Sequence, residues 1–158
     1  CRRRRGFARG GRIGLWEEEM AAPEAAIREL LETRRRALHD RDAKALLATY
    51  AAEADVFDLA PPLSHGPDPA GVAAWMASWD GPIGSETRQV AVRSADGVAF
   101  VAGLERLHGR QGGEPRDIWM RFTLGLVLSP EGWRIAHEHV SVPVRKTQIL
   151  MGATDLVP

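Results

Sequence analysis

Hydrophobic residues between Pro23 and Tyr50 recur with the 3.6-residue spacing of two helices. The first helix is expected to carry Pro23 in its first turn, where proline is well tolerated, and the second to follow Asp42. Their apolar positions are Ile27, Leu30, Leu31 and Leu38 in the first helix and Leu46, Leu47 and Tyr50 in the second. The two helices are therefore predicted to form a hairpin through residues 39–41.

A short strand and a third helix are predicted next. Residues 56–59 are typical of a strand, which the prolines at 61 and 62 end. Asp68 followed by Pro69 indicates a helix start, with a capping residue and a proline in the first turn. The apolar residues of this helix are Val72, Trp75, Met76 and Trp79.

After residue 85 the hydrophobic period changes to two. Strands are predicted at 86–95, 97–110, 116–129 and 133–143, separated by turn sequences at 96–97, 112–113 and 130–132. Helices followed by sequential hairpins indicate an α+β fold, in which three N-terminal helices pack on a curved, mainly antiparallel sheet.

The last predicted hairpin assigns side chains to the two faces of the sheet. A three-residue loop at 130–132 would pair Ser129 with Trp133. One face then carries Trp119, Arg121, Thr123, His137, His139 and Ser141, and the other carries Met120, Phe122, Leu124, Glu138 and Val140. Trp133, Ile135 and Val142 are expected to leave apolar area on the outer face, which predicts a homodimer through the sheet.

The amino-acid composition argues against several classes of partner and against a disulfide. The chain has 158 residues, with 21 Lys and Arg against 21 Asp and Glu, and zero net charge argues against a nucleic-acid partner. Its apolar runs are shorter than the roughly 18 residues of a membrane span, so no membrane partner is predicted. The single cysteine, Cys1, excludes an intrachain disulfide and fits a cytoplasmic location.

Residues 1–19 differ from the rest of the chain. They hold six arginines, and residues 1–14 have no helical or strand period. Glu17–Glu19 before Met20 is what a translated purine-rich ribosome-binding site would encode. We interpret 1–19 as a non-native or disordered extension, 20–144 as the domain and 145–158 as a tail. The alternative for 1–19 is a basic arm for nucleic acid or a membrane surface.

Polar residues on one predicted sheet face form a candidate site. Arg121 offers a cation, His139 an imidazole, Thr123 and Ser141 hydroxyls, and Trp119 an aromatic wall. This group suits an anionic or carbonyl-bearing small molecule. The alternative is a polar dimer face on the outside of the sheet.

Asp58 is a carboxylate inside an apolar strand, so it is either a hydrogen-bonded structural residue or a general base. Trp75 and Trp79 are either core or an aromatic lid over a cavity. Tyr50 is expected in the core with its hydroxyl satisfied, and Arg34–Arg36 on a solvated helix face.

Residues 137–139 are a candidate metal site. His137 and His139 would share one face, but no third ligand is evident, although Glu105 or His108 could serve. No metal and no other cofactor is therefore predicted.

The order of elements, together with the segments FDLAPP (57–62), GPIG (81–84) and HEHVSVP (137–143), resembles the SnoaL-like, ketosteroid-isomerase-like branch of the nuclear-transport-factor-2-like superfamily. The resemblance covers residues 24–143. It implies a cone-shaped α+β barrel with a pocket between sheet and helices, and usually a dimer through the sheet. Members include isomerases, polyketide cyclases, dehydratases, epoxide hydrolases and binding domains, so the fold does not choose a reaction.

The resemblance also implies residue roles. Asp58 matches the place of the proton-shuttling Asp of ketosteroid isomerases, whereas Arg34 falls where they carry an oxyanion-binding Tyr. Cyclase-like relatives favour His139 over Glu138 as a pocket residue.

The leading prediction is an isomerase- or cyclase-like enzyme that transfers a proton next to a carbonyl. Asp58 would be the base, and His139 and Arg121 would stabilise negative charge. A small hydrophobic or carbonyl-bearing ligand would contact Trp119, Thr123, Ser141, Tyr50, Trp75, Trp79 and Glu105. The alternative is a non-catalytic ligand-binding dimer.

Overall fold

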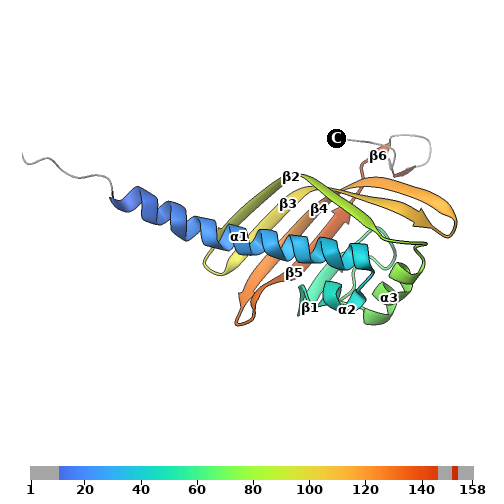
Figure 1. Cartoon of the computed structure of the whole chain (residues 1–158), viewed down its shortest axis with the longest axis horizontal. Coiled ribbons are helices and arrows are strands. Elements are labelled where there is room, and N and C mark those ends of the chain that lie inside the picture. Colours follow the sequence, from blue (N-terminus) through green and yellow to red (C-terminus); the bar gives the residue numbers. More distant parts are fainter. Residues whose placement is uncertain (1–10, 146–150, 153–158) are drawn as a thin grey trace, which may run out of the picture.

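Five strands form one curved sheet in the order β1-β5-β4-β3-β2 in a computed structural model that describes residues 11–145 and 151–152 (Figure 1). The strands are β1 (Tyr50–Phe57), β2 (Gly84–Ala95), β3 (Val98–Gln111), β4 (Glu114–Ser129) and β5 (Gly132–Ser141). Strand β1 runs parallel to β5, and the other neighbours are antiparallel. A separate small ladder joins β6 (Val144–Arg145) to β7 (Met151–Gly152).

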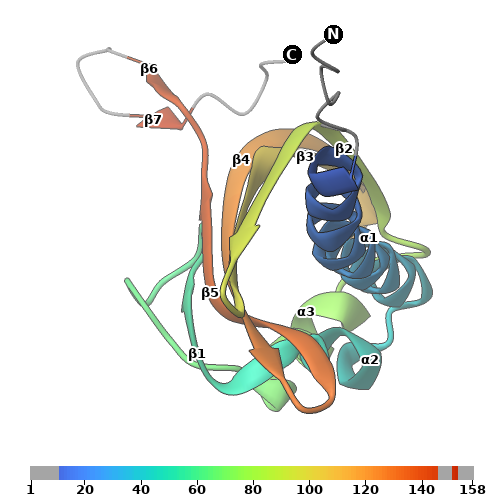
Figure 2. The same ribbon diagram turned by 90° about the vertical axis from the view of Figure 1, so that its left-hand side faces the viewer.

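Three helices lie on one side of this sheet. Helix α1 (Gly11–Asp40) crosses the concave face, and α2 (Ala43–Leu47) and α3 (Pro69–Ala77) lie at one end of it (Figure 2). Asp42 and Asp68 cap α2 and α3, because each carboxylate accepts a hydrogen bond from a backbone N–H of the first turn. The predicted α+β architecture, with three helices on a curved and mainly antiparallel sheet, is confirmed.

Several boundaries differ from the sequence prediction, and one of them concerns the site: β1 ends at Phe57, so Asp58 follows the strand instead of lying inside it. Helix α1 begins at Gly11 and contains Pro23 in its interior, whereas the pattern predicted a start at Pro23. Tyr50 begins β1 instead of continuing the second helix, which ends at Leu47. Residues 1–10 lie outside the described residues, and residues 11–19 form the first turns of α1. The interpretation of 1–19 as a non-native or disordered extension stays a prediction, and so does that of 145–158 as a tail.

The β4–β5 hairpin corrects the predicted outer face. Its turn has two residues, so Ser129 pairs with Gly132 and Ile135 pairs with Leu126. A β-bulge then leaves Ala136 without a ladder partner, and from His137 onward the register matches the prediction. Trp133 and Ile135 are consequently buried in the core, and the expectation that they face outward is wrong.

Two apolar clusters hold helices and sheet together. One packs Ile27 of α1 on the inner face of the sheet, against residues that include Phe122 and Leu124. The other joins α1, α2 and α3 through residues that include Leu38, Leu46, Met76 and Trp79. Tyr50 packs against both clusters, so its ring lies at the junction between them.

Candidate functional site

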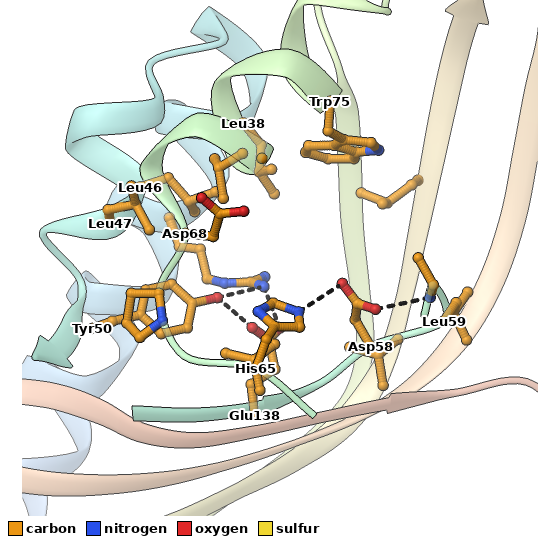
Figure 3. Close-up of a pocket in the computed structure, with 18 of the residues that line it drawn as sticks. Leu38, Leu46, Leu47, Tyr50, Asp58, Leu59, His65, Asp68, Trp75 and Glu138 are labelled. Carbon is orange, nitrogen blue, oxygen red and sulfur yellow. Dashed lines mark hydrogen bonds and ion pairs between the residues drawn. The ribbon is translucent and has the colours of Figure 1, made fainter. Parts of the chain in front are cut away.

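A cavity of about 620 Å³ opens between the helices, the inner face of the sheet and the segment that follows β1 (Figure 3). Its walls are largely apolar and include Leu38, Leu46, Leu47, Val72, Trp75 and Met120. A volume of this size and a mostly apolar lining are typical of small-molecule sites.

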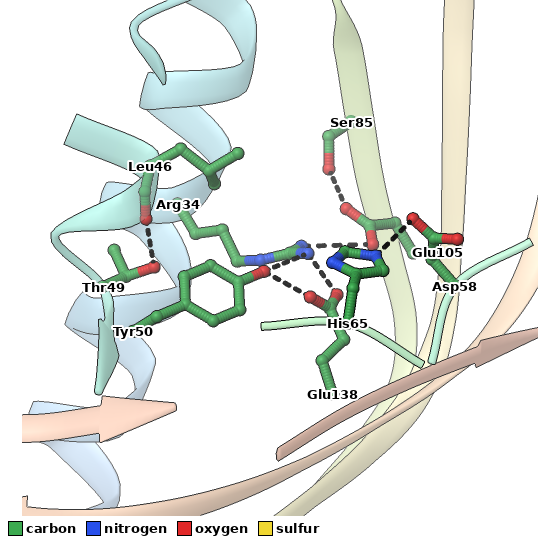
Figure 4. Close-up of polar contacts among 9 residues, drawn as sticks. All are labelled: Arg34, Leu46, Thr49, Tyr50, Asp58, His65, Ser85, Glu105 and Glu138. Atoms are coloured by element: carbon green, nitrogen blue, oxygen red, sulfur yellow. Dashed lines mark hydrogen bonds and ion pairs between the residues drawn. The ribbon is translucent and has the colours of Figure 1, made fainter. Parts of the chain in front are cut away.

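A buried polar network forms the floor of this pocket (Figure 4). The guanidinium of Arg34 donates to both carboxylates of the floor, from Nη1 to Glu105 at 3.4 Å and from Nη2 to Glu138. Arg34 Nη2 also lies 3.3 Å from the Tyr50 hydroxyl, which itself donates to Glu138. Ser85 donates to the other oxygen of Glu105 at 2.8 Å. The floor therefore joins α1, β1, β2, β3 and β5.

Burial and charge both act on this network. Burial alone would lower the pKa of Arg34, but the neighbouring carboxylate of Glu138, together with Tyr50 and Glu105, raises the pKa well above its usual value. Burial is also the main reason that the pKa of Tyr50 is raised, because it disfavours the phenolate. Arg34 is thus a permanent cation, and Tyr50 stays a neutral donor.

Asp58 and His65 form a second polar pair on the pocket wall (Figure 3). Val56 and His65 exchange two backbone hydrogen bonds, which bring the returning chain beside Asp58. His65 Nε2 lies 3.4 Å from Asp58 Oδ2, and Nδ1 lies 2.7 Å from the carbonyl oxygen of Gly66. Asp58 Oδ1 also accepts from the N–H of Ala60 at 2.8 Å, and the side chain is 41% exposed.

The two acceptors around His65 favour its charged form. Only the imidazolium carries a proton on both ring nitrogens. The carbonyl of Gly66 first, and the carboxylate of Asp58 next, raise the pKa of His65 above its ordinary value. The pair can therefore hold a proton beside a carboxylate at the pocket wall.

Several residues predicted for the site do line the pocket. They are Asp58, Tyr50, Trp75 and Glu105. Trp79 does not line it: it is buried in the helix cluster, where its ring meets that of Trp75 edge to face at 5.9 Å.

The polar group predicted on the other sheet face keeps its pairing but lies away from the pocket. Arg121 pairs with Ser141 and Thr123 with His139, as predicted, while Trp119 is covered by the guanidinium of Arg88 at 4.8 Å. Side chains alternate along β5, so Glu138 enters the pocket and His139 points outward. The expectation that His139 rather than Glu138 faces the pocket is corrected accordingly.

Two residues of the site were not predicted. Arg34 was expected on a solvated face, but only its neighbours Arg35 and Arg36 are exposed. The available signal was its position in the apolar stripe of α1, seven residues after Ile27. His65 follows no pattern in the sequence, because a backbone bridge formed in the fold brings it to Asp58.

His137 and His139, the candidate metal ligands, lie on the outer face. The ring of Phe57 lies 4.9 Å from that of His137 and 6.1 Å from that of His139, whereas Glu105 lies on the pocket side. In the part of the chain that the structure describes, no three His, Cys, Asp or Glu side chains gather where they could hold a metal ion.

Comparison with known proteins agrees with this architecture. A family model described as SnoaL-like domain matches residues 27–145. The chain belongs to the SnoaL-like domain family. This domain is also similar to a protein of unknown function from Pseudomonas putida KT2440, of the nuclear-transport-factor-2-like group, with 29% identity and a TM-score of 0.78 over 88% of this chain and 99% of that one.

More distant structures share the fold of the SnoaL-like domain. A proposed scytalone dehydratase from Novosphingobium aromaticivorans has 11% identity and a TM-score of 0.67, over 84% of this chain and 92% of that one. A proposed ketosteroid isomerase from Shewanella frigidimarina has 15% identity and a TM-score of 0.60, over 75% and 97%. No curated protein matches the chain. Among the described residues, none of the helices is long and apolar enough to cross a membrane.

Proposed function

We propose that this SnoaL-like domain binds a small, largely apolar carbonyl compound in its pocket and transfers a proton at the carbon next to the carbonyl. The observation that carries the proposal is the Asp58–His65 pair, which lies on the wall of a largely apolar cavity. A carboxylate beside a proton-holding imidazole supplies both partners of general acid–base catalysis.

Asp58 is the base in this proposal. Its carboxylate takes the proton from the carbon, the C–H electron pair moves into the new C=C bond, and the carbonyl oxygen gains the negative charge. The donor for that oxygen is the Nε2–H of charged His65, which lies on the same wall and would turn from Asp58 Oδ2, 3.4 Å away, to the substrate as Asp58 takes the proton. Return of the proton to another carbon completes an isomerisation without oxidation or reduction.

Arg121 and His139 have no part in this chemistry, because they lie on the sheet face away from the cavity. Arg34 and Tyr50 belong to the floor of the pocket, and their donor groups are already used in hydrogen bonds to Glu105 and Glu138. Similarity to proteins proposed as a ketosteroid isomerase and a scytalone dehydratase supports the same reaction class, since both names describe chemistry next to a carbonyl or enol.

Exchange of carbon-bound hydrogen tests the proposal without a known substrate. A panel of cyclohexanones and decalones is incubated with the protein in D₂O, and deuterium uptake next to the carbonyl is followed by NMR. We expect Asp58→Asn to slow the protein-dependent exchange by at least about 100-fold, the lower range for loss of a general base.

His139→Gln is the matched control, since it removes an imidazole from the outer face of β5. It should leave the exchange rate unchanged. An unchanged rate in Asp58→Asn, or a loss confined to His139→Gln, would contradict the assignment of the base.

A non-catalytic ligand-binding protein is the second candidate. It is favoured by one observation: Asp58 Oδ1 accepts the N–H of Ala60 at 2.8 Å, which is how an aspartate stabilises a turn. Exchange no faster than in buffer for every ketone of the panel would support this alternative.

A further inference from the structure

The floor of the pocket carries more negative than positive charge. Glu105 and Glu138 are 5% and 4% exposed, and the single guanidinium between them belongs to Arg34. Counted by formal charge, the buried network has two carboxylates against one guanidinium, an excess of one negative charge. Asp58 and Asp68 add carboxylates to the wall, where His65 is the one other basic side chain among the described lining residues.

The hydrogen bonds of the floor show the same imbalance. Each of the four oxygens of Glu105 and Glu138 accepts one donor, from Ser85, Arg34 or Tyr50. A carboxylate oxygen has room for about two donors, so acceptor capacity remains on every one of them. The Tyr50 hydroxyl already donates to Glu138, and Arg34 Nε, which has no partner, is buried out of reach of a ligand.

An uncompensated charge in a buried site is costly, and a ligand that supplies the missing partner recovers part of that cost on binding. An incoming anion would add to the excess charge. A neutral hydroxyl would satisfy an acceptor but leave the charge in place. A protonated amine satisfies an acceptor and also neutralises the floor.

We infer that the ligand of this pocket carries a basic amine, which binds at Glu105 and Glu138, while its apolar body lies along the walls toward Trp75. This inference deepens the proposed function and rests on it only in taking the same pocket as the ligand site. The amine at the floor leaves the remainder of the ligand to face Asp58 and His65. A compound with a basic group at one end and a carbonyl at the other is therefore the substrate class.

Three compounds with the same apolar body test the inference. They are adamantane-1-methylamine, adamantane-1-methanol and adamantane-1-carboxylate, whose binding to the full chain is measured by isothermal titration calorimetry near neutral pH. We expect the amine to bind at least about tenfold more tightly than the alcohol, and the carboxylate to bind most weakly.

Two variants locate the source of this preference. Glu105→Gln keeps the shape of the floor and leaves Arg34 paired with Glu138, so the amine-to-alcohol ratio should fall below about threefold. Glu86→Gln changes the net charge of the protein equally but removes an exposed carboxylate that pairs with Arg106 outside the pocket, so the ratio should be unchanged. If Glu105→Gln fails to fold, Glu138→Gln takes its place, and the comparison of the three compounds on the unaltered chain stands by itself.

Each outcome decides the question. Equal affinity for amine and alcohol, a preference that survives Glu105→Gln, or no measurable binding of the amine would overturn the inference. A clear preference for the amine with no ketone exchange would leave the ligand class standing and overturn only the proton-transfer function. Ketone exchange without a preference for the amine would leave the proton-transfer function standing and overturn the inference about the amine.

Discussion

Glu138 and His139 are neighbours in β5, yet their side chains lie on opposite faces of the sheet and in different environments. Glu138 is buried and accepts hydrogen bonds from Arg34 and Tyr50 in the pocket. His139 is exposed, pairs with Thr123 across the ladder and contacts Phe57 on the outer face. One step along a strand thus separates a floor residue from a surface residue.

This relationship predicts unequal costs for two adjacent substitutions. Glu138→Ala removes a buried carboxylate that two donors use, and a buried donor left unsatisfied costs about 1–3 kcal/mol. Because Glu105 still balances the charge of Arg34, we expect a loss of about 2 kcal/mol in the free energy of unfolding, chiefly from the unpaired Tyr50 hydroxyl. His139→Ala should change it by no more than about 0.5 kcal/mol. Urea denaturation of the two variants measures both values, and equal losses would contradict the assignment of Glu138 to the floor.

The change in thermal stability caused by Asp58→Asn distinguishes a catalytic role of Asp58 from a structural one. The asparagine oxygen can still accept the N–H of Ala60, and the lost ion pair with His65 is partly exposed. Exposed pairs are worth about 0–1 kcal/mol, so the variant should melt within about 4 °C of the unaltered chain. Thermal melts near neutral pH give the answer. A clearly larger drop in melting temperature would favour the ligand-binding protein over the enzyme.

The fold was largely predictable because its signals are local. Each of these signals depends only on residues that are close in the sequence. They are the change of hydrophobic period from 3.6 to two, the helix caps at Asp42 and Asp68, and the turn at Asp96–Gly97. Asp96 and Gly97 both have positive φ, as a two-residue hairpin turn of this type requires.

The site was predicted only in part, since its position depends on relations between distant elements. The pairing of Thr123 with His139 was predicted from the register of the hairpin, and it holds because the bulge at Ala136 offsets a turn that is one residue shorter than predicted. Neither register nor alternation says which face the helices cover. The signal for that was a charged residue in each apolar pattern, Arg34 in the stripe of α1 and Glu138 among the apolar residues of its face. A charged side chain at a buried position needs an oppositely charged or hydrogen-bonding partner, and here Arg34 and Glu138 pair with each other.

The bulge at Ala136 also changes the basis of the predicted homodimer. Trp133 and Ile135 are core residues, so the outer face must supply other apolar area. Phe57, Val98, Phe100 and Val127 are 39%, 55%, 49% and 37% exposed. Gly125 lies between Phe100 and His137 on neighbouring strands. Because glycine has no side chain, it does not cover the rings on either side of it.

We expect this face to bury an interface of at least about 1,000 Å² between two copies of the chain. Light scattering at micromolar concentration should give a mass near twice 17.3 kDa. Phe100→Glu places a charge in the interface and should shift the protein to monomer, whereas Leu63→Glu, at a side chain that is 98% exposed in a loop, should not. A monomeric mass for the unaltered chain would refute the dimer.

The charge on His65 predicts how stability depends on pH. The pKa of His65 is raised in the folded protein, through the carbonyl of Gly66 and then the carboxylate of Asp58, above its ordinary value of 6.5. A raised pKa means that the folded state binds the proton more tightly than the unfolded state does. The contribution of His65 to stability is therefore fully present below about pH 6.5, the ordinary value, and is lost as the pH rises through the higher folded value.

The unaltered chain and His65→Gln should accordingly differ more in melting temperature at pH 6 than at pH 8.5. NMR titration of the His65 ring gives the same information directly, with a midpoint above 6.5. Asp58→Asn should move that midpoint down but not fully to 6.5, because the Gly66 carbonyl, the larger cause of the shift, remains in place. A difference in melting temperature that grows toward high pH would have the wrong sign, since it would mean that His65 is held neutral, and Asp58 and His65 would then lack the proton that the proposed reaction needs.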